Sequence, residues 1–97
     1  MMANIRLENL NLTGNKIGDK GAQSLAMSLK VNNTLTSISL DTNQISTVGA
    51  KFFADALMVN TSLVTINLSS NNIGDEGARY LSLALKVNTT LTSIFLN

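Results

Sequence analysis

A single pattern recurs along this chain of 97 residues at a fixed interval of 28 residues. Nine of the 28 positions are identical in all three full copies, so the pattern is not a product of chance. A constant period of 20–50 residues predicts a solenoid built from stacked copies of one unit. We therefore predict a single domain, 1–97, whose units have the following bounds: a remnant of a preceding repeat at 1–6, full repeats at 7–34, 35–62 and 63–90, and a final strand at 91–97.

Each unit changes its hydrophobic period half-way along. Leu10 and Leu12 stand two residues apart, which indicates one side of a strand, whereas Ala22, Leu25 and Leu29 have helical spacing. We expect the helices to begin at N-caps and to end at asparagines in left-handed geometry. The expected N-caps are Asp19, Thr47 and Asp75, and the expected end residues are Asn32, Asn60 and Asn88.

Stacking decides the architecture that such units build. One strand-and-helix unit cannot bury its own apolar face, but neighbouring copies bury it jointly. Helices are about 10 Å wide and strands lie about 4.8 Å apart, so the stack curves with the sheet inside. The predicted fold class is α/β: a short solenoid segment of about three and a half repeats, with a parallel β-sheet on the concave face and α-helices on the convex face.

The motif Leu7-x-x-Leu10-x-Leu12-x-x-Asn15-x-Ile17, followed by Gly21-Ala22, resembles the leucine-rich repeat. The length of 28 residues resembles the ribonuclease-inhibitor-like type in particular. That resemblance implies a ladder of side chains that satisfies backbone groups where each strand bends into a turn; here it would consist of Asn15, Asn43 and Asn71. The chain also resembles the leucine-rich-repeat effectors of intracellular bacteria such as Legionella.

Composition excludes several kinds of chemistry. Cysteine and histidine are both absent, which removes thiolate nucleophiles, the commonest metal ligands and the usual general base. The formal net charge is only +1 and the basic residues are scattered, so neither nucleic acid nor a membrane is an expected partner. Gly21, Gly49 and Gly77 recur with the period, which indicates close packing at the start of each helix. We expect no catalysis, no cofactor and no metal.

Strand alternation predicts which side chains remain free for binding. Residues between the inward-facing leucines must face the concave side. They are Asn9, Asn11 and Thr13, then Ser37, Ser39 and Asp41, then Thr65, Asn67 and Ser69, and lastly Ser93 and Phe95, with Asn97 after them. All but two are small and uncharged. Asp41 is the one charge, and Phe95 is either an exposed anchor for a partner or an aromatic that folds over incomplete terminal packing.

The strands alone offer too little area for a stable interface. Four strands at about 4.8 Å spacing give a face of roughly 200–250 Å², against about 800 Å² per partner in a stable complex. We therefore expect the turns after the strands to contribute, at 13–16, 41–44 and 69–72.

The leading hypothesis is a non-catalytic module that binds another protein through its concave face and adjacent turns. The resemblance implies a sharper version, in which the module covers the active site of a partner enzyme and inhibits it. The alternative is a structural segment that associates with itself, or with further repeats, through uncapped ends. The start of the chain lacks the features of a secretory signal. We expect an intracellular protein, either cytoplasmic or delivered into a host cell.

Overall fold

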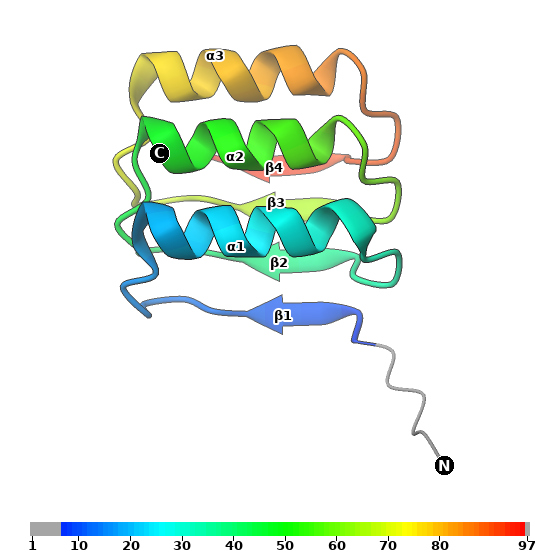
Figure 1. Cartoon of the computed structure of the whole chain (residues 1–97), viewed down its shortest axis with the longest axis horizontal. Helices are drawn as coiled ribbons and strands as arrows, with labels where there is room; N and C mark the ends of the chain where they lie inside the picture. Colours follow the sequence, from blue (N-terminus) through cyan, green and yellow to red (C-terminus); the bar gives the residue numbers. More distant parts are fainter. Residues whose placement is uncertain (1–6, 97) are drawn as a thin grey trace.

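The computed structural model describes residues 7–96. The predicted remnant at 1–6 and the last residue of the predicted final strand, Asn97, lie outside this range. Strands and helices alternate along the chain and form two layers, a sheet and a row of helices (Figure 1). The elements are β1 (Asn9–Asn11), α1 (Gly18–Val31), β2 (Ser37–Ser39), α2 (Thr47–Leu57), β3 (Thr65–Asn67), α3 (Gly74–Leu85) and β4 (Ser93–Phe95). This arrangement confirms the predicted α/β solenoid.

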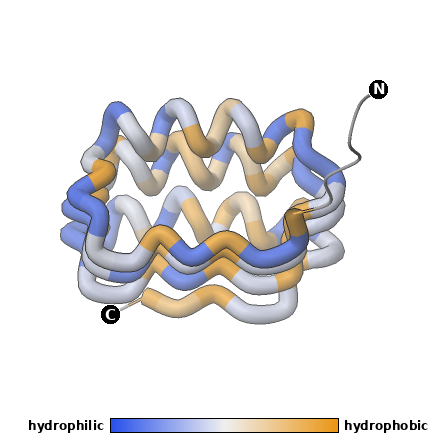
Figure 2. Tube along the Cα trace, turned by 90° about the horizontal axis from the view of Figure 1, so that it is seen from below, coloured by the Kyte–Doolittle hydropathy of each residue, from blue (hydrophilic) through white to orange (hydrophobic). Residues whose placement is uncertain are grey.

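The four strands pair in chain order, all parallel, and each residue pairs with the one 28 positions later. Leu10, Ile38, Ile66 and Ile94 are therefore register partners across the sheet. Ile38 and Ile66 are buried, and their strand neighbours are half-buried. Figure 2 shows the resulting alternation of hydrophobic and hydrophilic positions along the strands. The shared register places equivalent side chains of successive units side by side.

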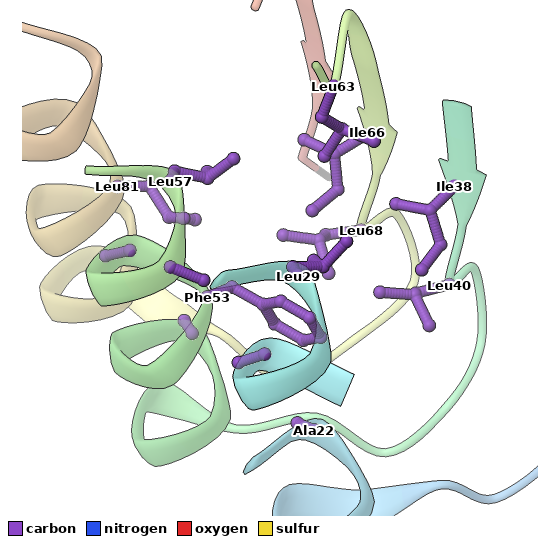
Figure 3. Close-up of a cluster of buried hydrophobic side chains, with 14 of the residues drawn as sticks. Ala22, Leu29, Ile38, Leu40, Phe53, Leu57, Leu63, Ile66, Leu68 and Leu81 are labelled. Atoms are coloured by element: carbon purple, nitrogen blue, oxygen red, sulfur yellow. The ribbon is translucent and has the colours of Figure 1, made fainter. Parts of the chain in front are cut away.

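The core lies between the sheet and the helices and runs through the middle of the stack. Its bulkiest member is Phe53 of α2, which has no exposed surface. Figure 3 shows its ring pointing from the helix toward Leu40 and Leu68 at the ends of two neighbouring strands. Branched aliphatic side chains and small alanines fill the remaining space. The helix layer is thus attached to the sheet by residues from several repeats at once.

The expected close packing at the start of the helices is confirmed. A Cβ atom added at Gly49 would lie 2.6 Å from Asp19 Oδ1 and 3.1 Å from Ala22 Cβ, both in the preceding unit. At Gly77 it would lie 3.2 Å from Ala50 Cβ. In both cases the nearest atom is Cγ2 of the isoleucine four residues earlier in the same unit, at 2.5 Å for Gly49 and closer still for Gly77. A side chain is therefore opposed at these positions both by the turn that enters the helix and by the neighbouring helix.

The predicted N-caps are wrong. α1 and α3 begin after Ile17 and Ile73, whose side chains make no capping bond, and α2 is capped by Ser46, whose Oγ accepts from the Val48 N–H. Asp19 and Asp75 instead lie in the first turns of their helices.

Asp19 contacts the next repeat rather than its own helix. Its Oδ1 accepts from the backbone N–H of Ser46 at 2.8 Å and of Gly49 at 3.1 Å, and its Oδ2 accepts a short bond from Ser46 Oγ. Thr47, at the equivalent repeat position, donates from Oγ1 to the Ile73 carbonyl at 2.7 Å. At Asp19 and Thr47 this position therefore links the start of the helix to the following unit, which a local capping rule does not anticipate.

Burial acts to raise the pKa of the Asp19 carboxyl, but the hydrogen bonds from Ser46 and Gly49 outweigh it and hold the pKa below its usual value. We expect Asp19→Asn to lower the free energy of unfolding at pH 7 by about 1–2 kcal/mol, because the charged acceptor of these hydrogen bonds is lost. The loss is no larger because solvent partly screens the charge at this half-exposed site. A carboxylate with a lowered folded-state pKa stabilises above its unfolded value, about 3.9, and loses that contribution as the pH falls through the folded value.

Urea titrations at several pH values check this expectation. The difference between wild type and Asp19→Asn should be largest near neutrality and should shrink below about pH 4. Asp75→Asn is the matched control, because no helix follows α3 within residues 7–96. A difference that stays constant down to pH 2 would contradict the assigned role of the Asp19 charge.

The expected left-handed ends of the helices are also wrong. Asn32 is extended, with φ −76° and ψ 132°. Within residues 7–96 the non-glycine residues with positive φ are Lys16, Thr42, Gln44 and Ser70, which all lie in the turns that connect strands to helices.

Asn60 acts across repeats in a different way. Its Nδ2 donates to the carbonyl of Leu29 at 2.8 Å and of Asn32 at 3.2 Å, and its Oδ1 accepts from the N–H of Leu63 at 2.8 Å. Asn88 repeats the pattern, donating to Leu57 and Asn60. Each of these asparagines thus satisfies a carbonyl left unpaired at the end of the preceding helix.

Candidate protein-binding surface

A ladder of asparagines holds the turns that border the sheet. Asn43 has no exposed surface, and its Oδ1 accepts from the N–H of Asn15 at 2.8 Å and of Ile17 at 3.3 Å. Its Nδ2 donates to the carbonyls of Leu12 at 2.8 Å and Asp41 at 3.2 Å.

Asn71 forms the next rung. Its Oδ1 accepts from the N–H of Asn43 at 2.8 Å and of Ile45 at 3.0 Å, and its Nδ2 donates to the Leu40 carbonyl at 2.9 Å. Asn15 donates within its own repeat, to the Leu12 carbonyl at 2.8 Å. Because the side chains of Asn43 and Asn71 each join two repeats, the turns after the strands stand in a fixed order beside the sheet.

The sequence-derived concave residues form two rows across the strands. Register pairs Asn9 with Ser37, Ser37 with Thr65 and Thr65 with Ser93, and it pairs Asn11 with Ser39, Ser39 with Asn67 and Asn67 with Phe95. All eight side chains are half-buried or exposed. The predicted residues therefore come together in one continuous surface, as the shared register requires.

Part of this surface is occupied by hydrogen bonds within the chain. Asn11 Oδ1 accepts from the Thr13 N–H at 3.0 Å, and Asn67 Oδ1 accepts from the Ser69 N–H at 2.9 Å. Thr13 Oγ1 and Ser39 Oγ lie 3.1 Å apart and share a hydrogen bond. These hydrogen bonds favour one orientation of each side chain, which lowers the side-chain entropy that binding would cost.

A third row of predicted concave residues lies just after the strands and contains their one charged residue, Asp41. Thr13, Asp41 and Ser69 follow their strands, and the Gly14 N–H donates to the Asp41 carbonyl at 2.9 Å. Asp41 is half-buried, and its Oδ1 accepts from Thr42 Oγ1 at 3.2 Å. A carboxylate at the border of an otherwise neutral surface favours a cation on a partner at that point.

Phe95 ends the second row on the last strand. Half of its surface is exposed, at 51%. Leu96 beside it is 38% exposed and lines an open groove of about 280 Å³ with Leu68 and Ile73. The exposure favours the reading of Phe95 as a surface residue over the alternative that it folds onto the terminal packing.

Among residues 7–96, no group of three or more His, Cys, Asp or Glu side chains could hold a metal ion. No helix in the same range is long and apolar enough to cross a membrane.

Comparison with known proteins agrees with this geometry. The family profile described as "Leucine Rich repeat" matches residues 3–26, 31–54 and 59–82, which together make up more than half of the chain. The chain belongs to the leucine-rich repeat family. No curated protein sequence matches this leucine-rich repeat domain significantly.

One solved structure similar to this leucine-rich repeat domain is described as "Leiomodin-1 Actin-Binding Site 2 (ABS2)". It has a TM-score of 0.87 and 25% sequence identity, and the match covers 92% of this chain. The match covers only 53% of that chain, so the domain spans about half of its length. The neighbour shares the fold of this domain, and actin binding is described for that protein.

Sequence reasoning missed one role and one pair of residues in this leucine-rich repeat domain. For Asn60 and Asn88, which were expected only as helix ends, it missed the hydrogen bonds to the preceding repeat. The pair is aromatic and lies on the helix layer: Phe52 and Tyr80, where the first repeat has Ser24. That departure from the repeat was the available signal for the pair.

Proposed function

We propose that this leucine-rich repeat domain is a non-catalytic module that binds a partner protein through its concave sheet and the turns that follow the strands. The observation that carries the proposal is the row Asn11, Ser39, Asn67 and Phe95, aligned by register across four strands. It ends in a half-exposed aromatic, and aromatic side chains dominate interface energies. The neutral polar positions around Phe95 would form the rim that such an anchor needs.

Affinity capture from the source cell tests the proposal when it is made with variants. Thr65→Arg places a long charged side chain in the middle of the sheet, beside Ser37 and Ser93. We expect it to remove the partner that wild type captures at one-to-one stoichiometry. Gln23→Arg is the matched control on the exposed side of α1, where Arg79 occupies the equivalent repeat position, and it should retain the partner.

Titration of the captured partner measures the contribution of Phe95. Phe95→Ala should weaken binding by about 2 kcal/mol, roughly thirtyfold in Kd. A partner held equally well by wild type, Thr65→Arg and Phe95→Ala would show that the concave face is not the binding surface.

Actin is the first defined partner to try, because the similar solved structure is described as an actin-binding site. Sedimentation with filaments and titration of monomers should both be run, with Thr65→Arg beside wild type. The sharper predictions of an inhibited partner enzyme, of a ribonuclease-inhibitor-like type and of a bacterial effector inside host cells stay predictions. An assay of the captured partner's activity tests the first of these.

A further inference from the structure

A second surface lies on the outer side of the helix layer, away from the sheet. An open groove of about 460 Å³ runs between α2 and α3. Its apolar lining comes from Val48 and Phe52 of α2 and Tyr80 of α3. Val48 is 55% exposed, and the two aromatics are half-buried against the core. The groove therefore presents apolar surface to the outside over two adjacent helices.

The fold itself does not require these side chains. Position 24 of the first repeat is equivalent to Phe52 and Tyr80, and there the chain has an exposed serine. Val48 is likewise equivalent to Lys20 and Glu76. Because the same helix forms with Ser24, the aromatic pair is a property of this groove and not of the repeat.

Charges of alternating sign border the apolar lining. Glu76 lies in the first turn of α3, Lys51 Nζ lies 5.6 Å from the centroid of the Tyr80 ring, and Asp55 lies one turn further along α2. Glu76 of α3 occupies the same repeat position as Val48 of α2, so it lies at the same height along the helix axis. Measured along α2, the three charges therefore lie at the heights of residues 48, 51 and 55. At 1.5 Å per residue these heights are separated by about 4.5 and 6 Å.

We propose that this groove docks one amphipathic helix of a partner protein. Two neighbouring helices form a natural seat for a third, whose apolar stripe would cover Phe52 and Tyr80. The acidic–basic–acidic order of Glu76, Lys51 and Asp55 is matched by a basic–acidic–basic order on the incoming helix. The spacing calls for basic residues at i and i+7 and an acidic residue at i+3 or i+4. This site is separate from the concave face, and its occupation does not depend on the function proposed there.

A pair of synthetic helical peptides of about six turns tests the proposal. Both carry one apolar stripe and lack Tyr and Trp. One presents Lys–Glu–Lys at the stated spacing, and the other presents Glu–Lys–Glu. Tyr80 is the only tyrosine and tryptophan is absent, so the intrinsic fluorescence of the domain reports directly on the groove. We expect the Lys–Glu–Lys peptide to bind at least tenfold more tightly and to change the Tyr80 fluorescence.

Inverting the charges of the groove provides a second, more specific test. A triple variant, Lys51→Glu, Asp55→Lys and Glu76→Lys, should reverse the preference between the peptides. Reversal supports the groove; an unchanged preference, or equal affinity of wild type for both peptides, overturns it. Absence of any fluorescence change at peptide concentrations up to about 1 mM overturns it too.

Two further variants separate this site from the concave surface. The double variant Phe52→Ser with Tyr80→Ser introduces the residue that the first repeat already has at this position. It should abolish peptide binding, while circular dichroism shows that the helices are intact. Because this variant lacks Tyr80, peptide binding is measured by calorimetry. Thr65→Arg, on the sheet, should leave the Kd for the peptide unchanged. Loss of peptide binding in Thr65→Arg would assign the peptide to the concave face and overturn the groove, whatever the result of partner capture.

Discussion

Asn43→Ala is expected to lower the free energy of unfolding by about 3–5 kcal/mol. The side chain is completely buried and makes four hydrogen bonds to backbone groups. Alanine leaves the N–H groups of Asn15 and Ile17 without this acceptor, and leaves the Leu12 carbonyl with one donor fewer. Each unsatisfied buried group costs about 1–3 kcal/mol. A domain of this size has only about 5–15 kcal/mol in total.

The effect should be localised as well as large. In a stack of repeats, stability is a sum of unit terms and nearest-neighbour terms, and Asn43 belongs to the interface of the first two units. Hydrogen exchange at the amides of Asn15 and Ile17 should accelerate more than exchange in α3. Asn15→Ala is the matched control, because Asn15 is exposed and bonds within its own turn. Equal destabilisation by the two variants would contradict the cross-repeat role.

Phe53→Ala is expected to cost about 3–5 kcal/mol as well, by a different mechanism. The ring is completely buried in the cluster that joins α2 to the strands, and it points toward Leu40 and Leu68 (Figure 3). Its removal leaves a cavity in the middle repeat, where neighbours on both sides limit collapse. Guanidinium titration would show the lower midpoint with an unchanged slope.

Phe53→Leu tests whether the site requires the aromatic ring or only a large apolar side chain. The first and third repeats have Leu25 and Leu81 at this place, so leucine fits the repeat, and the expected loss is about 1–2 kcal/mol. Phe52→Ala is the surface control, since Phe52 is only half-buried, and it should cost clearly less than Phe53→Ala. If Phe52→Ala proved the more damaging of the two, the assignment of Phe53 to the core would be wrong.

Much of the fold followed from the period of 28 residues. That spacing made Leu10, Ile38 and Ile66 equivalent, and equivalent residues become register partners whenever parallel strands stack one unit apart. The same reasoning grouped Asn11, Ser39, Asn67 and Phe95 on one face. The exposed state of Phe95 did not follow, because a terminal aromatic has two accessible environments and only packing selects between them.

The caps show where reasoning from local sequence failed. Asp19 and Asn32 have the residue types that cap helices, and capping rules consider only the few residues on either side. In the stack the nearest unpaired backbone groups belong to the adjacent repeat. Asp19 therefore reaches Ser46 and Gly49, and Asn60 reaches Leu29. A polar side chain bonds to the partners that surround it in space, and these are known only after the units are placed.

By itself the sequence determined the unit, its strand and helix, the parallel sheet and the polar character of the concave face. Those properties depend on periodicity and alternation, which any stack of identical units transmits from one copy to the next. Only the tertiary structure decided which residues join the repeats and which apolar side chains stay exposed, including the groove of Phe52 and Tyr80. These depend on contacts between residues about 28 positions apart, whose geometry is fixed by how the units pack and not by the order of residues within one unit.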